Sequence, residues 1–299
     1  RAENFDPAKN RLTLTEVHRF PNGPVERDSS LYWDFNAISS EIKTGLKKAL
    51  DIDKNIVGIA VDTWGVDYVI LKKDGSYARL PYHYRDSRTD SMPQKVFSII
   101  PKEKLYARTG IQFMQLNTIY QLAAHKEKHP EDLAEGNTFL FVPDAITNML
   151  CGCKACEYTI ASTSNLLDAK KRDWDFELLS MLGIPRSIFP EIKMPGTQAG
   201  TLAPGLMKEF NCGPIPVMFA GSHDTASAVA SVPADDSKTW AYVSCGTWAL
   251  LGAELSEPKL TLDAMNSDYT NEGGLGGSIR FLTNIMGSWL FQETKRVWN

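Results

Sequence analysis

The chain has 299 residues, of which 43% are hydrophobic and 23% charged, a composition typical of a globular protein whose length suggests about two domains. A formal net charge of -4 gives no global attraction to nucleic acid or to an acidic membrane surface, and no apolar run is long enough to span a bilayer. Five cysteines, an odd number in a long chain, favour reduced thiols in the cytoplasm over a disulfide framework.

The first quarter of the chain predicts two strands around one helix. Alternating apolar and polar residues predict a half-buried strand over 12–20, and an apolar stripe predicts a helix over 36–51. The apolar run 55–61 predicts a strand buried on both faces. The segment DTWGVD (62–67) follows, and its carboxylates and glycine suit a ligand site. A structural turn with Trp64 in the core explains this segment equally well.

The stretch 216–230 is the clearest candidate site. An apolar strand is followed by small residues typical of a closely packed helix, and Gly221, His223 and Asp224 lie at the junction. Ligands of α/β proteins bind at such strand ends, and a carboxylate there can accept a proton from a substrate hydroxyl. Taken alone, the pattern favours the simpler interpretation, in which Asp224 or Thr225 caps the helix.

Past the polar stretch 233–237, which fits a domain boundary, two strands are predicted at 239–244 and 248–253. They flank Cys245-Gly246-Thr247, whose amides and hydroxyl could form an anion-binding nest, although most such turns are ordinary hairpins. The glycines of 271–277 predict a turn, and no Walker sequence occurs in the chain.

Three cysteines, Cys151, Cys153 and Cys156, lie close together in the sequence. A structural zinc site would need a fourth ligand, usually from a second pair at fixed spacing. The favoured interpretation is therefore an incidental turn between a helix and a strand. Near the end of the chain, the run 281–292 predicts the beginning of a further helix.

Twelve short motifs occur in the order that the FGGY carbohydrate kinases show, and the chain resembles this family, most closely its branch that acts on L-rhamnulose. The motifs are HRFPNG (18–23), YWD (32–34), DTWGVD (62–67), YRDSRT (84–89), GIQF (110–113), NT (117–118), YQL (120–122), EYT (157–159), SHDTASAV (222–229), GTW (246–248), NEGG (271–274) and NIMG (284–287). Each is weak alone, but together they cover nearly the whole chain in order.

The resemblance implies an α/β chain with an actin-like, ribonuclease H-like fold, in which two domains close over a cleft. It implies an N-terminal, sugar-binding domain at 1–232 and the start of a C-terminal, ATP-binding domain at 233–299. Members of the family begin with a strand and a phosphate-binding loop, which this chain lacks together with most of the second domain. We therefore expect the 299-residue polypeptide to be inactive alone, and robust kinase activity from it would contradict this.

The resemblance also implies a reaction: transfer of the ATP γ-phosphoryl group, with Mg²⁺, to the 1-hydroxyl of L-rhamnulose, giving L-rhamnulose 1-phosphate in L-rhamnose catabolism. Asp224 would be the general base, and in this context that role outweighs a helix cap. The implied sugar contacts are Gly65, His223, Thr225 and Asn284, and the implied ATP contacts are Thr247 and Gln292. Asn284 and Gln292 would face one cleft from a single helix, about two turns apart. No residue is implied as a metal ligand.

Two alternatives stay open. The first is a kinase for another ketose, such as L-fuculose or D-xylulose, because one pocket residue can change the preference. The second is a non-catalytic sugar sensor on the same scaffold, which the presence of Asp224, His223 and Thr247 argues against. The expected partners are a small-molecule sugar and ATP, and the sequence says little about the oligomeric state.

Overall fold

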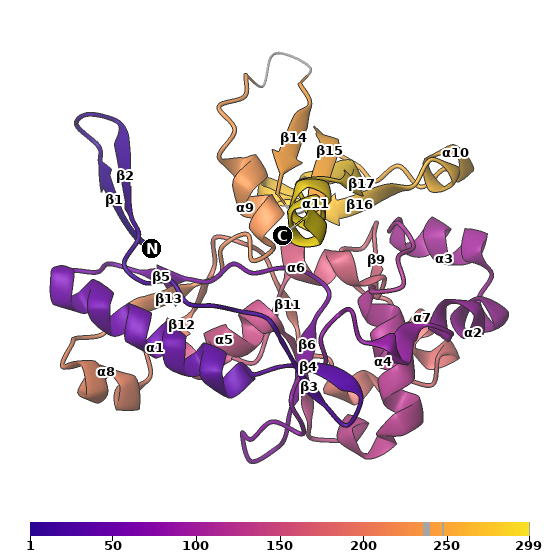
Figure 1. Ribbon diagram of the computed structural model, residues 1–299, viewed down its shortest axis with the longest axis horizontal. Coiled ribbons are helices and arrows are strands. Elements are labelled where there is room, and N and C mark those ends of the chain that lie inside the picture. The colour runs from indigo at the N-terminus through magenta and orange to yellow at the C-terminus, as the bar shows by residue number, and fades with distance from the viewer. Residues whose placement is uncertain (236–239, 247, 299) are drawn as a thin grey trace.

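The computed structural model describes residues 1–235, 240–246 and 248–298 (Figure 1). The N-terminal part, residues 1–230, contains β1 (Ala2–Asp6), β2 (Arg11–Thr15), β3 (Pro24–Arg27), β4 (Ser30–Trp33), α1 (Phe35–Ile52), β5 (Ile59–Ala60), β6 (Tyr68–Leu71), α2 (Met92–Ile99), α3 (Lys102–Thr109), α4 (Thr118–Lys128), β7 (Thr138–Phe141), α5 (Val142–Cys151), β8 (Cys156–Glu157), α6 (Tyr158–Ala161), β9 (Leu167–Asp168), β10 (Asp173–Trp174), α7 (Phe176–Met181), β11 (Ile192–Lys193), β12 (Gln198–Thr201), α8 (Pro204–Phe210), β13 (Pro216–Met218) and α9 (Asp224–Ala230). The C-terminal part, from residue 240 on, contains β14 (Tyr242–Cys245), β15 (Trp248–Leu255), α10 (Leu262–Asn266), β16 (Tyr269–Gly273), β17 (Ile279–Met286) and α11 (Trp289–Trp298).

The helix predicted over 36–51 is confirmed as α1. Asp34 precedes it, and its carboxylate accepts a hydrogen bond of 3.0 Å from the amide of Ala37, which satisfies one of the free donors at the helix start. Ile38 and Leu50 of the apolar stripe are buried. The side-chain pattern and the cap therefore agree on where this helix begins and which face it buries.

The core of the N-terminal part surrounds the antiparallel pair β6–β7. Phe139, Leu140 and Phe141 of β7 are completely buried, and residues of α2, α4, α5 and α7 belong to the same apolar cluster. Aromatic and β-branched residues favour such buried strands. This core supports the loops that follow β5 and β13, whose parallel pairing joins Val217 to Ile59.

Two strand predictions near the N-terminus are wrong in their burial. The strand predicted as half-buried over 12–20 is the shorter β2, which pairs with β1, and Phe5, Leu12 and Leu14 remain more than half exposed. The strand predicted as buried over 55–61 is reduced to β5, and Val57 is 89% exposed. Burial depends on neighbouring strands, and within the described residues β5 pairs only with β13.

The C-terminal part is an antiparallel sheet with the order β14-β15-β17-β16. It lies above α6 in the view of Figure 1. The helix predicted over 281–292 is wrong in its first half, because β17 occupies 279–286 and only α11 is helical. β17 pairs along its whole length with β15 and over residues 279–283 with β16, and this pairing outweighs the local helical pattern. The turn predicted over 271–277 is likewise wrong at its start, where β16 continues to Gly273.

The two parts make contact along β16. The carbonyl of Gly110 accepts hydrogen bonds of 2.9 Å from both the backbone amide and the side-chain amide of Asn271. The hydroxyl of Tyr106 donates to the carbonyl of Tyr269 at 2.8 Å, and the amide of Gly273 donates to Ser162 Oγ at 2.7 Å. Since neighbouring positions of one strand bind three separate sites, β16 fixes the orientation of the C-terminal sheet.

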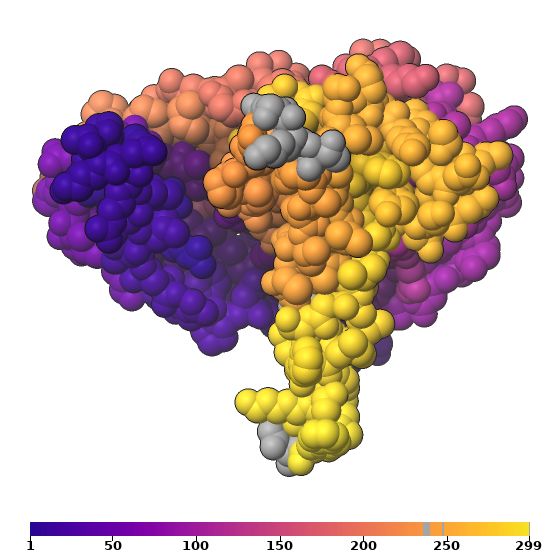
Figure 2. All heavy atoms as spheres, turned by 90° about the horizontal axis from the view of Figure 1, so that it is seen from above, coloured from indigo at the N-terminus to yellow at the C-terminus, as the bar shows by residue number. Residues whose placement is uncertain are grey.

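A view from above shows the C-terminal part as a ridge across one face, from which α11 projects (Figure 2). No residue of α11 is buried, and Phe291 and Trp298 are among its exposed apolar side chains. Among the helices that the structure describes, none combines the length and the apolar character needed to cross a membrane.

We expect Gly110→Ala to destabilise the chain more than Gly152→Ala. Both glycines end helices with a positive φ, 67° at Gly110 and 78° at Gly152, so both variants share the cost of placing a side chain in the left-handed region. A Cβ at Gly110 would lie 2.5 Å from Leu260 and 2.8 Å from Asn271, whereas nothing lies within 4 Å at Gly152. The steric difference predicts about 1–3 kcal/mol of additional loss. Urea unfolding of both variants measures it, and equal losses would contradict the close approach of the two parts at Gly110.

Candidate active site

The site is built where two parallel strands end side by side. The loops after β5 and β13 exchange backbone hydrogen bonds: the amide of Thr63 donates to the carbonyl of Ser222, and the amide of Asp224 donates to the carbonyl of Thr63, both at 2.9 Å. The predicted segments 62–67 and 222–228 therefore form one surface. Ligands bind at the carboxyl ends of such strands because the loops there are free to diverge around them.

Asp224 is the first residue of α9, and its side chain is 58% exposed. The residue at the cap position is His223, which makes no side-chain cap bond. The Asp224 carboxylate accepts from the amide of Thr225 at 2.6 Å and from its hydroxyl at 3.2 Å. Neither Asp224 nor Thr225 occupies the cap position, so the structure does not support the simple cap interpretation, and the carboxylate retains free acceptor positions.

Glu157 stabilises the turn that precedes α9. Its role was not identified from the sequence. Its buried carboxylate accepts from the amide of Ser222 at 3.1 Å and from the hydroxyl of Thr159 at 2.6 Å. The same Thr159 oxygen accepts from the amide of His223 at 3.2 Å. Burial raises the pKa of Glu157 above its usual range, against these bonds, which act to lower it. The only signal in the sequence was the motif EYT at 157–159.

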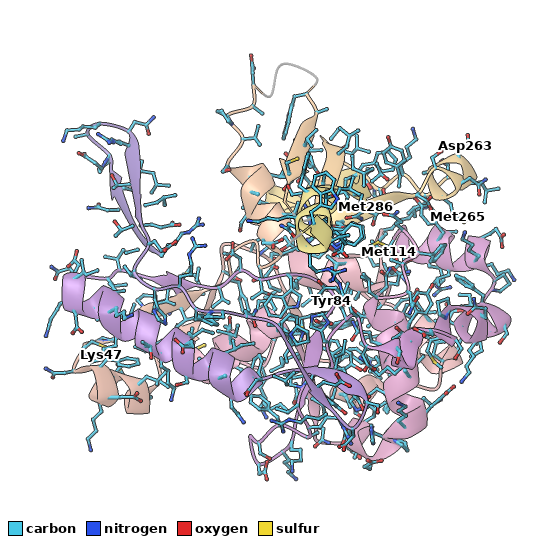
Figure 3. The ribbon with its side chains drawn as sticks, viewed as in Figure 1. Lys47, Tyr84, Met114, Asp263, Met265 and Met286 are labelled. Carbon is cyan, nitrogen blue, oxygen red and sulfur yellow. The ribbon has the colours of Figure 1, made fainter. Side chains whose placement is uncertain are left out.

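A cavity of about 530 Å³ opens in front of Asp224, a volume typical of small-molecule sites. It is lined from the N-terminal part by Trp64, Gly65, Val66, Tyr84, Ile111, Gln112, Met114, Leu116, Asn117, Thr163, His223, Asp224, Thr225 and Ala228, and from the C-terminal part by Ser244, Gly246, Trp248, Leu250, Thr270, Glu272 and Asn284. Figure 3 shows Tyr84 and Met114 where the N-terminal part faces the sheet of the C-terminal part.

The structure brings five of the seven predicted site residues to this cavity: Gly65, His223, Asp224, Thr225 and Asn284. Asn284 reaches it from β17, and its side-chain amide donates to Gln112 Oε1 at 2.9 Å across the two parts. Asn284 and Gln292 therefore do not share a helix, which corrects the sequence prediction.

Of the two predicted ATP contacts, Gln292 lies exposed on α11 and is not among the residues that line the cavity. The other, Thr247, falls outside the described residues. Two interpretations were considered for the loop that contains Trp64, a ligand site and a structural turn with Trp64 in the core, and the position of Trp64 agrees with both. It lines the cavity and also packs against the core, with its ring centre 4.4 Å from that of Trp33.

His223 faces charged groups through both ring nitrogens. Its Nε2 lies 3.6 Å from Asp224 Oδ1. Its Nδ1 lies 3.1 Å from an Arg280 nitrogen and 3.3 Å from Glu272 Oε2. Arg280 is completely buried and also contacts Glu272 at 3.1 Å. The imidazole ring thus lies between a carboxylate at the cavity and a buried ion pair behind it.

A second carboxyl group, Asp62, lies near Asp224. Partial burial, followed by the negative charge of Asp224, raises the pKa of Asp62.

Across the described ranges, no group of three or more His, Cys, Asp or Glu side chains could hold a metal ion. The cluster of Cys151, Cys153 and Cys156 lies between α5 and β8, at a turn from helix to strand. Chemically, the cavity offers a proton acceptor, hydrogen-bonding groups and few fixed charges.

Two family models match the chain. The N-terminal domain model of the FGGY family of carbohydrate kinases matches residues 10–230, and the C-terminal domain model of the same family matches residues 241–299.

Among curated proteins, the chain is 42% identical over 287 residues to a rhamnulokinase of Bacteroides thetaiotaomicron, covering 96% of this chain and 59% of that protein. It is 43% identical over 288 residues to a rhamnulokinase of Pectobacterium carotovorum, covering 96% of this chain and 56% of that protein. The chain spans about 60% of the length of the curated relatives it matches.

Among solved structures, a ligand-bound xylulose kinase from Lactobacillus acidophilus superposes with a TM-score of 0.80 at 17% identity, covering 92% of this chain and 56% of that one. A glycerol kinase from Plasmodium falciparum with ADP superposes with a TM-score of 0.76 at 15% identity, covering 92% and 58%. These likenesses confirm the two-domain, actin-like α/β fold predicted from the sequence.

We expect the titration of Asp67 to decrease the free energy of unfolding from about pH 4 to about pH 6. The carboxylate of Asp67 accepts a hydrogen bond from Trp64, which lines the cavity. Burial raises the pKa of Asp67 to about 6, although bonds from Trp33, Gln121 and Trp64 lower it. Between the unfolded and folded pKa values the folded state keeps a proton that the unfolded state has lost, so stability falls as pH rises through this window.

The loss attributable to Asp67 is on the order of 2–3 kcal/mol. Urea unfolding as a function of pH should show a shallower slope for Asp67→Asn than for the wild type. Asp263→Asn, on the exposed start of α10, serves as the matched control and should keep the wild-type slope. Identical slopes for all three proteins would exclude Asp67 as the source.

Proposed function

The chain belongs to the FGGY family of carbohydrate kinases, and from this premise we propose that it forms the sugar-phosphorylating site of an ATP-dependent L-rhamnulose kinase. The observation that carries the proposal is the exposed carboxylate of Asp224 at a strand end, facing a sugar-sized cavity. The choice of L-rhamnulose is supported by relatives named rhamnulokinase that are 42–43% identical over nearly the whole chain.

In the proposed reaction Asp224 is the general base. Its carboxylate accepts the proton of the sugar's 1-hydroxyl while that oxygen bonds to the γ-phosphorus of ATP. The bond from the γ-phosphorus to the bridging oxygen breaks, which releases ADP and leaves L-rhamnulose 1-phosphate. The bond from Thr225 to Oδ1 fixes the orientation of the carboxylate, and this restricts the direction in which the free oxygen can accept a proton.

The remaining sugar contacts follow from the cavity walls. Gly65 lines the cavity, and a Cβ there would occupy space beside the cavity residues Thr163 and His223, at 3.4 Å from Oγ1 and 3.6 Å from Nε2. Glycine leaves this space free for the sugar. Asn284 lines the cavity, and because its side-chain amide donates to Gln112, its carbonyl oxygen would be the group that accepts from sugar hydroxyls. Together with His223 and Thr225, these groups would orient the ketose so that its 1-hydroxyl meets Asp224.

ATP would enter from the side of the C-terminal part. Thr247 and Gln292 are proposed as its contacts on the strength of the family motif. When Mg²⁺ is bound, it neutralises charge on the phosphates, and it usually takes only one or two protein carboxylates. Asp62 would be the residue to hold it, since it supplies carboxylate oxygens beside the strand ends and near Asp224.

The proposed domain division, 1–232 for the sugar-binding domain and 233–299 for the start of the ATP-binding domain, agrees closely with the ranges of the two family models. All five cysteines are unpaired, which suits the cytoplasm proposed as the location of this metabolic enzyme.

We expect Asp224→Asn in the full product of the gene to lower kcat by about 100- to 10,000-fold, since the amide cannot accept the hydroxyl proton. Asp263→Asn is the control, because Asp263 also lies in the first turn of a helix but far from the cavity-lining residues. ADP release in the presence of ketose and ATP measures both. A variant of Asp224 with wild-type kcat would exclude it as the base.

The sugar is tested separately with a panel of ketoses led by L-rhamnulose and including L-fuculose and D-xylulose. We expect the highest kcat/KM on L-rhamnulose. Faster turnover of another ketose would keep the mechanism and change the substrate. Binding of a ketose by calorimetry without any ADP release would favour the alternative of a non-catalytic sugar sensor.

A further inference from the structure

His223 has two neighbours at Nδ1 that demand opposite protonation states. A guanidinium nitrogen of Arg280 lies 3.1 Å away and can only donate a hydrogen bond. Glu272 Oε2 lies 3.3 Å away and, when ionised, can only accept one. A neutral imidazole carries one N–H, so whichever neighbour binds Nδ1 also decides whether the nitrogen facing the cavity carries the proton.

The geometry favours Arg280. Its contact with Nδ1 has the geometry of a hydrogen bond, whereas Glu272 Oε2 is buried and has no hydrogen-bond partner in the described part of the chain. Burial acts to raise the pKa of Glu272, but the charge of Arg280 is the largest of the causes that lower it below its usual range, so the carboxyl is ionised. Glu272 therefore balances the charge of Arg280, while Arg280 donates to the ring.

Arg280 is held so that it cannot turn away. Its Nε donates to the carbonyl of Gly273 at 2.9 Å, its Nη2 contacts Glu272 at 3.1 Å, and the side chain is completely buried. The planar guanidinium presents its donors in a fixed fork. The contacts with Gly273 and Glu272, both on β16, thus direct Nη2 of Arg280 toward His223.

We propose that Arg280, supported by Glu272, is a positioning residue that keeps neutral His223 in the tautomer with its proton on Nε2. The nitrogen that faces the cavity is then a hydrogen-bond donor and not a base.

The consequence rests on the proposed function. His223 and Asp224 are two potential proton acceptors beside one substrate hydroxyl, with Nε2 and Oδ1 only 3.6 Å apart. If Nε2 already carries a proton, Asp224 alone can accept the one from the 1-hydroxyl. His223 instead donates to a sugar oxygen or to the Asp224 carboxylate, which orients the sugar without competing for its proton.

The first test needs no activity. The full chain, with histidine labelled by ¹⁵N, is examined by NMR at about pH 8, where an ordinary histidine is neutral, and the His223 signals are assigned by their loss in His223→Asn. We expect protonated Nε2 and unprotonated Nδ1. A proton on Nδ1, or rapid exchange between the two forms, would overturn the proposal whatever the enzyme phosphorylates.

Two variants separate the neighbours. Arg280→Lys keeps the charge but loses the fork, so we expect the Nδ1–H form to appear and kcat to fall about 10- to 100-fold while the KM for ATP stays unchanged. Glu272→Gln keeps the Arg280 donor and should retain the Nε2–H form. If Glu272→Gln changed the tautomer and Arg280→Lys did not, Glu272 would be the controlling group and the proposal would be wrong.

Arg172→Lys is the matched control for the arginine. Arg172 also bridges to the C-terminal part, through a bond of 3.4 Å to the carbonyl of Ser256, but it is only partly buried and does not line the cavity. We expect the wild-type tautomer and kcat. If no variant or wild-type protein phosphorylates a ketose, the proposed function fails, while the tautomer measurement still decides the role of Arg280.

Discussion

The carboxylate of Glu157 is the interaction on which the site depends, because it joins the start of α6 to the turn before α9. One of its oxygens accepts hydrogen bonds from the amide of Ser222 and from the hydroxyl of Thr159. The Thr159 oxygen in turn accepts from the amide of His223. A buried carboxylate is costly unless donors surround it, and these donors come from two segments more than sixty residues apart. Loss of the carboxylate would leave their amides unsatisfied, so the position of Asp224 is determined by a residue that never reaches the cavity.

Hydrogen bonds between distant segments also determine how the two parts of the chain contact each other. Three consecutive residues of β16 contact the N-terminal part: Asn271 binds Gly110, Glu272 lies beside His223, and Gly273 binds Ser162. Such bonds have strict distance and angle requirements. They specify one orientation of the C-terminal sheet, and that orientation is what brings Asn284 and Trp248 into the wall of the cavity.

The sequence was most informative where local pattern and tertiary position agree. The helix α1 has both a cap and an apolar stripe, and the small residues of α9 follow a short strand, so both elements and the position of Asp224 could be predicted. Motif order then led to Gly65, His223, Thr225 and Asn284. The pattern misled where pairing decides the outcome: Asn284 lies in a helical pattern, but the pairing of β17 with β15 makes it part of a strand.

Two kinds of information were absent from any local pattern. The burial of a strand depends on strands that lie elsewhere in the chain, which is why the exposure of β2 and β5 was mispredicted. The partners of a buried polar side chain also come from distant segments, as with Glu157 and Ser222 or with Arg280 and His223. No spacing rule connects residues that are 57 or 65 positions apart, so these contacts became visible only in three dimensions.

The arrangement around His223 links the assembly of the cleft to its chemistry. The proposed base, Asp224, belongs to the N-terminal part, whereas Arg280, the donor proposed to control the tautomer of His223, belongs to the C-terminal part. Without Arg280 at Nδ1, the ring could expose an acceptor nitrogen 3.6 Å from Asp224, and a bound hydroxyl could then donate to either group. With the sheet in place, only the carboxylate accepts. A cleft built in this way would acquire a single, directed proton acceptor only when both of its walls are present, which is the condition under which transfer to a sugar, and not to water, is favoured.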